Sequence, residues 1–150
     1  MSGFLVDTSV LSIFAPDRPP VPLPLRRWIV EQGAQEALFT SSIVVLETGR
    51  GIAKLRRTGG LSRADRLEAW LASLLADFDD RTLPVDTAIA SLAGEIEDAA
   101  IARGRSPGLA DVLIAATARV HDLTVLTSNA RHFEALGVAH LDPLTSPLPA

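Results

Sequence analysis

Three acidic residues stand in apolar stretches of this 150-residue chain, far apart along the sequence. Asp7 ends a short apolar run at the N-terminus, Glu47 follows four apolar residues without a break, and Asp111 is the only carboxylate of segment 107–118. A carboxylate in such surroundings is costly unless it is paired or binds a metal. Carboxylate oxygens suit the hard cations Mg²⁺ and Mn²⁺, which can activate water and neutralise charge on a phosphoryl oxygen. The three residues therefore indicate an acidic metal site.

Each of the three acids also has an ordinary structural interpretation. Asp7 would suit the N-cap of a helix that begins near residue 8. Glu47 would form an ion pair with Arg50 or Lys54 on a solvated helix face, an interaction worth about 0.3–0.5 kcal/mol. Asp111 would lie in the first turn of a helix, where the helix dipole favours a negative charge. From the residues alone, both interpretations stay open for each acid.

The residues around Glu47 favour a buried, functional carboxylate over one on a solvated helix face. The four apolar residues before Glu47 predict that the first turns of its helix are buried nearly all round. Gly49 and Gly51 follow inside the same expected helix, where each glycine costs about 1 kcal/mol relative to alanine. We expect the close approach of a backbone or a ligand to justify these two glycines.

The elements that must position the acids alternate between strands and helices, which predicts an α/β fold with a mostly parallel sheet. The carboxyl edge of such a sheet is where open α/β folds bind ligands, and Asp7 would lie there. Asp86 is a candidate N-cap, Ser62–Asp65 resembles a capping box, and Gly104 should end a helix. We expect strands at 3–6, 37–40, 81–84, 123–127 and 138–141, the last at an edge. We expect helices at 10–15, around 25–29, and at 42–57, 67–75, 87–103, 107–120 and 130–136, with a proline-rich loop over 16–24.

Composition limits the class of protein. The hydrophobic fraction of 47% predicts one domain over residues 1–150 with a substantial core, and the proline-rich end at 143–150 predicts a loose tail. The chain has no cysteine, which excludes disulfides, thiolate zinc sites and cysteine nucleophiles. It has no long apolar run and no signal-peptide pattern, so we expect no membrane span and a cytoplasmic location. The net charge of −4 argues against a broad basic surface for nucleic acid but leaves room for a local one.

Four motifs occur in order along the chain. They are Val6-Asp7-Thr8-Ser9, then Val45-Leu46-Glu47 followed by Gly51, then Leu109–Ala118 around Asp111, and finally Leu123–Asn129 with His132-Phe133. Together these motifs resemble those of PIN-domain ribonucleases, above all the toxins of VapBC-type toxin–antitoxin pairs. The resemblance covers residues 4–143.

The resemblance implies a three-layer α/β/α fold around a sheet of about four to five strands, and cleavage of single-stranded RNA that depends on Mg²⁺ or Mn²⁺. It assigns the catalytic and metal-site acids to Asp7, Glu47 and Asp111. The fourth acidic position of the family corresponds to Asn129, whose amide can ligate a metal through its oxygen but supplies no charge. The number of metal ions, one or two, therefore stays open.

Further roles follow from the same resemblance. Thr8 and Thr127 are hydroxyl residues next to the acids that could orient ligands or water, although Thr8 could equally begin a helix. The family implies a toxin that inhibits translation, a small cognate antitoxin as its partner, and a homodimer. The alternative function is a catalytically weak or inactive PIN-like module that binds RNA or protein. A dehalogenase-type hydrolase is disfavoured, because Ser9 stands where its second Asp would be required.

Basic residues offer candidate contacts to RNA. Arg50, Lys54 and Arg57 recur at intervals of four and three on the helix that carries Glu47, and would present positive charge to RNA phosphates near the acids. A solvated helix face is the alternative for this row. Arg103 and Arg105, just before the Asp111 helix, are weaker candidates for RNA contact.

The histidines, the tryptophans and one leucine stripe are predicted to have structural roles. His121, His132 and His140 lack the spacing of metal ligands and are predicted to be surface or capping residues. Trp28 and Trp70 are predicted to be mostly core, as is the leucine stripe at 67, 71 and 74. The alternative for part of that set is an exposed groove for an antitoxin helix.

Overall fold

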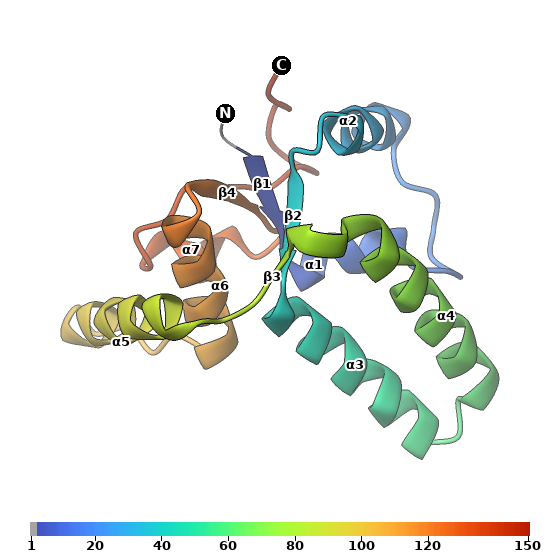
Figure 1. Ribbon diagram of the computed structural model, residues 1–150, viewed down its shortest axis with the longest axis horizontal. Coiled ribbons are helices and arrows are strands. Elements are labelled where there is room, and N and C mark those ends of the chain that lie inside the picture. The colour runs from blue at the N-terminus through green and yellow to red at the C-terminus, as the bar shows by residue number, and fades with distance from the viewer. Residues whose placement is uncertain (1–2) are drawn as a thin grey trace.

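The computed structural model describes residues 3–150 and has a five-stranded sheet at its centre (Figure 1). Every pair of neighbouring strands is parallel, and the strand order is β3-β2-β1-β4-β5. The predicted α/β class is confirmed, and the sheet is parallel throughout. Its strands are β1 Gly3–Val6, β2 Leu38–Ser41, β3 Thr82–Leu83, β4 Leu123–Leu126 and β5 His140–Leu141.

Helices cover both sides of the sheet, as the three-layer prediction requires. Figure 1 shows α2, α3 and α4 to one side of the strands and α5, α6 and α7 to the other. This division follows from right-handed crossovers, because the chain moves outward from β1 to β3 and then returns past β1 to β4 and β5. The α-helices are α1 Thr8–Leu11, α2 Leu23–Ala34, α3 Ser42–Arg57, α4 Leu61–Phe78, α5 Thr87–Ala102, α6 Leu109–Val120 and α7 Ala130–Glu134. Two short 3₁₀ turns, η1 Ser12–Phe14 and η2 Asp79–Arg81, complete the elements.

The strand order reverses between β1 and β4, and ligands of open α/β folds bind at such a reversal, at the carboxyl ends of the strands. The register pairs Leu5 with Val125 and Val6 with Leu126, so β1 and β4 end level with each other. The residues that follow the two strands therefore emerge side by side at this edge.

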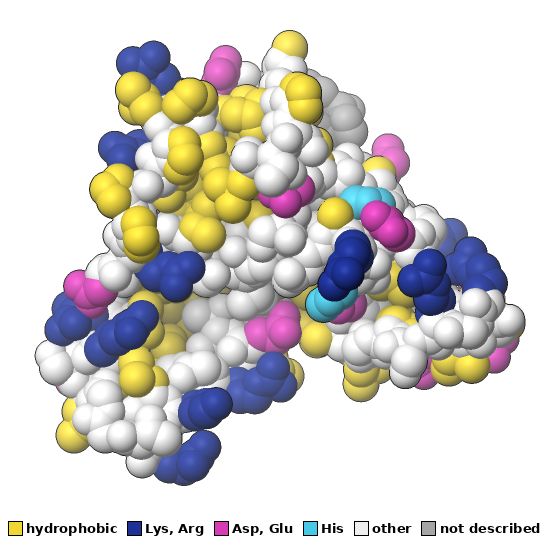
Figure 2. All heavy atoms as spheres, turned by 180° about the vertical axis from the view of Figure 1, so that it is seen from behind, with side chains coloured by type: hydrophobic (Ala, Val, Ile, Leu, Met, Phe, Trp, Pro, Cys, Tyr) yellow, Lys and Arg dark blue, Asp and Glu magenta, His cyan; other side chains and the backbone are white. Residues whose placement is uncertain are grey.

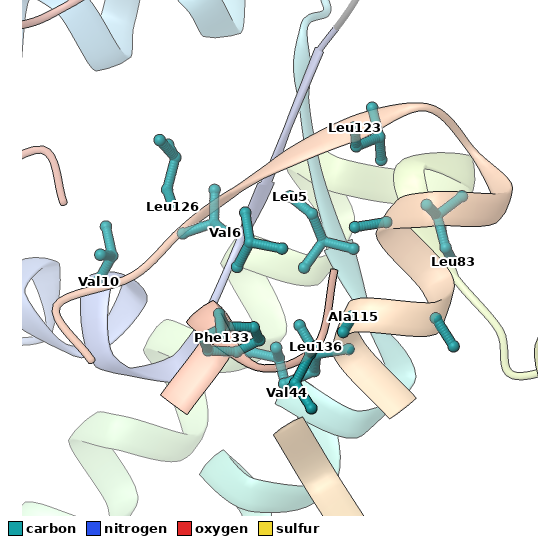
Figure 3. Packing of buried hydrophobic residues seen from close by; sticks show 14 of the residues in the cluster. Leu5, Val6, Val10, Val44, Leu83, Ala115, Leu123, Leu126, Phe133 and Leu136 are labelled. Atoms are coloured by element: carbon teal, nitrogen blue, oxygen red, sulfur yellow. The ribbon is translucent and has the colours of Figure 1, made fainter. Parts of the chain in front are cut away.

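The core holds this edge rigid. Leu5 and Val125 have no solvent exposure, and α6 lies over β4 with Ile114 and Ala115 fully buried. Figure 3 shows Phe133 of α7 close to Leu136 and Val44, so the segment after β4 is anchored in the same cluster. The prediction that the Asp111 helix is central is confirmed by its burial.

Two local capping predictions are confirmed. The Asp86 Oδ1 accepts a hydrogen bond of 2.9 Å from the amide of Ile89 at the start of α5. Gly104 follows the end of α5 with a φ of +77°, a backbone conformation that favours glycine. The predicted capping box at Ser62–Asp65 is wrong, because α4 begins at Leu61 with no side-chain cap. Asp65 instead accepts a hydrogen bond from Arg56 at 2.8 Å.

The environment of α3 also differs from the prediction. Leu46 is 55% exposed, so the first turns of α3 are not buried all round. No atom of another element lies within 4 Å of where a Cβ would stand at Gly49 or Gly51. Contacts within the described chain therefore do not require these glycines.

The C-terminal segment 143–150, expected as a loose tail, has no helix or strand and is mostly exposed, but two contacts connect it to the core. The indole Nε1 of Trp28 donates a hydrogen bond of 2.8 Å to the carbonyl of Pro149, and Leu148 packs against the core. The three prolines of this segment suggested a loose end, but the buried Trp28 ring has a polar nitrogen that needs an acceptor. Across residues 3–150, no helix combines the length and the apolar character needed to span a bilayer.

Candidate functional site

Asp7 lies at the sheet edge where the strand order reverses. Its backbone amide donates to the carbonyl of Leu126 at 2.9 Å, which continues the pairing of β1 with β4. The side chain is only 4% exposed, and its Oδ1 accepts a hydrogen bond of 2.8 Å from the amide of Thr8. The interpretation of Asp7 as the N-cap of α1 is therefore confirmed, and it uses one of the two carboxylate oxygens.

The second oxygen of Asp7 is held by two hydroxyl groups. Thr127, directly after β4, donates to Oδ2 at 2.8 Å, and Ser9 donates to the same atom at 3.0 Å. Each hydroxyl also accepts a backbone hydrogen bond of 3.0 Å, Ser9 from the amide of Ser128 and Thr127 from that of Asn129. Within residues 3–150, no basic side chain forms an ion pair with Asp7, so its negative charge has only neutral donors around it.

The region around Asp7, which we call the acidic corner, also includes Glu47, which contacts it through Thr8. The Thr8 hydroxyl donates to Glu47 Oε1 at 2.8 Å, which brings α3 against the start of α1. The alternative ion pair also exists, since the Arg50 guanidinium lies 3.9 Å from Glu47 Oε2. That contact is long, and the Arg50 side chain is 70% exposed, so it contributes little stability.

Asp111 lies in the first turn of α6, as predicted, and contacts His132 of α7. The His132 Nδ1 is 3.1 Å from Asp111 Oδ2. Burial raises the pKa of Asp111, and the negative charge of Asp7 raises it further, while His132 opposes the shift. The repulsion between the two negative charges is thus one of the causes that raise the pKa of Asp111.

Two hollows flank the acids. One, of about 440 Å³, is lined by Thr8, Glu47, Lys54 and Trp70 among others. The second, of about 310 Å³, lies beside Asp111. Figure 2 shows basic side chains gathered over the α3–α4 arm, with a second group over the arm that carries α5 to α7.

The comparisons with known proteins agree with this architecture. The model of the PIN domain family matches residues 4–138. The chain belongs to the PIN-domain family. It is 34% identical over 139 residues to Toxin FitB of Neisseria gonorrhoeae, covering 93% of this chain and 96% of that protein. It is 43% identical over 75 residues to Ribonuclease VapC10 of Mycobacterium tuberculosis, covering 50% of this chain and 53% of that protein.

A solved structure supports the same assignment. The crystal structure of FitAcB from Neisseria gonorrhoeae superposes with a TM-score of 0.81 at 33% identity, over 95% of this chain and 99% of that one. The resemblance inferred from the four sequence motifs is thus confirmed at the level of family and fold.

The PIN-domain chain brings some predicted residues together and separates others. Lys54 shares the hollow of Glu47 and Thr8. Arg57 instead lines a different hollow and lies ten residues along α3 from Glu47, about 15 Å in a helix. The Asn129 side chain forms no hydrogen bond with the acids in the part of the chain that the structure describes, although its backbone amide donates to Thr127.

Two polar residues of the site were missed by the sequence analysis. Ser9 holds Asp7 and the chain after β4, and His132 contacts Asp111. Ser9 could have been suspected from its position two residues after Asp7, at the same strand end. His132 gave a weaker signal, its place directly before the buried Phe133 in a helix that follows β4.

The donor set of this PIN domain fits a hard divalent cation. The converging groups are carboxylate and hydroxyl oxygens, and the charges of Asp7 and Asp111 repel each other. No three His, Asp or Glu side chains among residues 3–150 are close enough to form a ready-made metal cage. A divalent ion at this acidic corner would have to keep several of its waters, as Mg²⁺ usually does.

Proposed function

We propose that this PIN-domain protein is a Mg²⁺- or Mn²⁺-dependent endoribonuclease that acts as the toxin of a toxin–antitoxin pair and cleaves RNA to inhibit translation. The observation that carries the proposal is the pair of acids Asp7 and Asp111 at the strand-order reversal. The negative charge of Asp7 raises the pKa of Asp111, and neither carboxylate has an arginine or lysine partner in the described residues. Such a corner is stabilised by a cation.

In this proposal, Asp7 and Asp111 hold the metal ion, and Glu47 is a further ligand or positions the attacking water. Thr8 fixes the Glu47 carboxylate through its hydroxyl, while Thr127 and Ser9 fix Asp7 Oδ2. A bound Mg²⁺ or Mn²⁺ supplies an activated water at neutral pH and neutralises charge on the phosphate.

The biological role and partners are inferred from the relatives. One relative is named as a toxin and another as a ribonuclease, and the solved structure of VapBC-5 from Mycobacterium tuberculosis is described as a member of the VapBC family of toxin-antitoxin systems. We infer a small cognate antitoxin as the partner, RNA as the substrate, a homodimeric assembly and a cytoplasmic location. Arg50 and Lys54 would contact RNA phosphates beside Glu47, and Arg57 would do so farther along the strand.

The proposal is tested with the variant Asp7→Asn. Asparagine is as good an N-cap as aspartate, so the variant keeps the cap of α1 but loses the charge. Asp86→Asn is the matched control, because it makes the same change at the cap of α5. We expect wild type and Asp86→Asn to cleave RNA with Mg²⁺ or Mn²⁺ and to stop in EDTA, whereas Asp7→Asn loses at least about 100-fold in rate.

Two results would contradict the proposal. Cleavage by Asp7→Asn at the wild-type rate would place the activity elsewhere or in a contaminant. An inactive wild type that still binds RNA or the antitoxin would favour the alternative, a PIN-like binding module. The antitoxin partner is tested by looking for a small protein encoded in a neighbouring reading frame, co-expressing it with this chain, and measuring both complex formation and loss of cleavage.

A further inference from the structure

The hollow beside Asp111 differs from the rest of the acidic corner in its charge. It measures about 310 Å³ and lies between the amino end of α6 and the helix α7. In Figure 2, basic, histidine and acidic side chains stand next to one another over this arm of the molecule. Its lining includes Arg105, Arg131 and His132, together with Asp111, Pro107 and Gly108.

The two arginines of this hollow make no polar side-chain contact within the described residues. Neither Arg105 nor Arg131 forms an ion pair or a side-chain hydrogen bond with any of residues 3–150. The carboxylate that shares the hollow, Asp111, contacts His132 instead. The hollow therefore holds two unpartnered guanidinium groups next to one of the proposed metal ligands.

Some other arginines of the chain form internal contacts. Arg56 bridges Asp65 and Glu68 between α3 and α4, each at 2.8 Å. Arg103, only two residues before Arg105, donates a hydrogen bond to the carbonyl of Ala135. Some exposed arginines elsewhere in the described chain, such as Arg27 and Arg119, also make no internal polar contact, so the lack of a partner alone does not mark a site. What marks this hollow is that two unpartnered guanidinium groups line it together beside Asp111, an arrangement that suits an external anion.

The position of the hollow suggests which anion. It opens beside Asp111, while the basic residues of α3 lie on the Glu47 side of the corner. A nucleic-acid strand that crosses the acids would have cationic groups at both ends of its path. Its volume is at the lower end of the range for ligand sites, about 300–1,000 Å³, so it accommodates one nucleotide unit rather than a folded partner.

We propose that this hollow, the Arg105–Arg131 pocket, binds a phosphate of the RNA strand next to the one that is cut. A planar guanidinium donates two parallel hydrogen bonds to phosphate oxygens, which lysine cannot do. The amino end of the 12-residue α6 faces the same hollow and adds its positive dipole end. The inference rests on the proposed nuclease function and deepens it by naming a substrate contact.

The first test measures RNA binding in the cleavage-deficient Asp7→Asn background. The double variant Arg105→Ala/Arg131→Ala should bind a single-stranded RNA about tenfold more weakly, with a slope of log K against log salt reduced by about 0.7 for each lost contact. Arg119→Ala is the control, since it removes an exposed arginine at the opposite end of α6, outside this hollow. It should leave both the affinity and the salt slope unchanged.

The second test measures cleavage with the wild-type acids in place. The double variant should raise KM with little change in kcat, because the pocket binds substrate without touching the reacting atoms. An RNA with one neutral methylphosphonate next to the cleavage site should remove the difference between the double variant and wild type. Arg131→Lys keeps the positive charge but loses the paired donors of the guanidinium, so its KM should lie between those of wild type and the double variant.

The inference is overturned if the double variant matches Arg119→Ala in RNA affinity, salt slope and KM while wild type cleaves normally. It is also overturned if RNA binding is intact and only the affinity for the antitoxin falls, which would make the pocket a protein contact. A wild-type protein that neither binds nor cleaves RNA refutes the proposed function as well, so the two failures are distinguishable. Unchanged melting temperatures of these surface variants exclude misfolding as the cause of any effect.

Discussion

Thr127 offers a test of how Asp7 is held, because one buried hydroxyl connects the two strand ends. The side chain has no solvent exposure, donates to Asp7 Oδ2 at 2.8 Å and accepts from the amide of Asn129 at 3.0 Å. Thr127→Val replaces the hydroxyl by a methyl group of similar size and deletes both hydrogen bonds. A hydrogen bond to a charged acceptor contributes about 1.5–3 kcal/mol, so we expect a loss of about 2 kcal/mol in the free energy of unfolding.

This loss has two readouts. In EDTA, a domain of this size should lose about 4–8 °C in melting temperature, measured by scanning calorimetry. In the nuclease assay, the Mg²⁺ or Mn²⁺ concentration at half-maximal rate should rise by about 10–100-fold, the usual effect of removing a partner that orients a metal ligand.

Thr127→Ser separates orientation of Asp7 from packing. Serine keeps the hydroxyl but loses a buried methyl group, which costs about 1 kcal/mol of stability. It should therefore lower the melting temperature and leave the metal dependence of the rate close to that of wild type. The reasoning is refuted if Thr127→Val keeps the wild-type metal dependence, or if Thr127→Ser shifts it by the same amount.

Three further predictions concern stability. Burial and the negative charge of Asp7 raise the pKa of Asp111 above its ordinary value of 3.8, so ionisation of Asp111 destabilises the fold as the pH rises through the raised pKa. Asp111→Asn should therefore raise the melting temperature in EDTA at pH 7. A gain in melting temperature that persists at pH 3 would contradict this prediction. Trp28→Phe deletes the hydrogen bond to Pro149 and should cost about 1 kcal/mol, with faster proteolysis of the C-terminal segment; unchanged proteolysis would mean that the segment is held by other contacts. Gly94→Ala, at an open helical position of α5, should stabilise the fold by about 1 kcal/mol. Gly104→Ala, at a φ of +77°, should destabilise it by about 1–2 kcal/mol. The free energy of unfolding from chemical denaturation should rise for the first variant and fall for the second.

The parts of the fold that sequence patterns predicted are those with local causes. The apolar run before Asp7 sufficed to place β1, because a buried parallel strand needs apolar residues on both faces. The cap at Asp86 and the helix end at Gly104 depend on backbone groups within a few residues. The failed capping box at Ser62–Asp65 had a suitable pattern, but Asp65 lies beside Arg56 of α3 and pairs with it.

The polar contacts of the site could not be predicted because they depend on strand register. The pairing of Val6 with Leu126 sets the ends of β1 and β4 level, and only then do Ser9 and Thr127 converge on one oxygen of Asp7. A slip of one residue would turn Thr127 to the other face of the sheet. Hydrophobic patterning indicates which segments are strands, but four-residue strands carry too little pattern to fix their alignment.

The two interpretations of Asp7 that the sequence left open, helix cap and metal ligand, are compatible because they use different atoms. The cap occupies Oδ1 through the Thr8 amide, while hydroxyl protons from Ser9 and Thr127 reach Oδ2. Neutral donors orient the carboxylate without cancelling its charge, whereas an arginine in their place would satisfy the acid and compete with a cation. The negative charge that remains on Asp7 raises the pKa of Asp111, so the ionised acids cost stability, and the proposed cation would restore that stability on binding. The cap thus fixes where the charge lies, and among residues 3–150 no basic side chain neutralises it, which is what the proposed metal site requires.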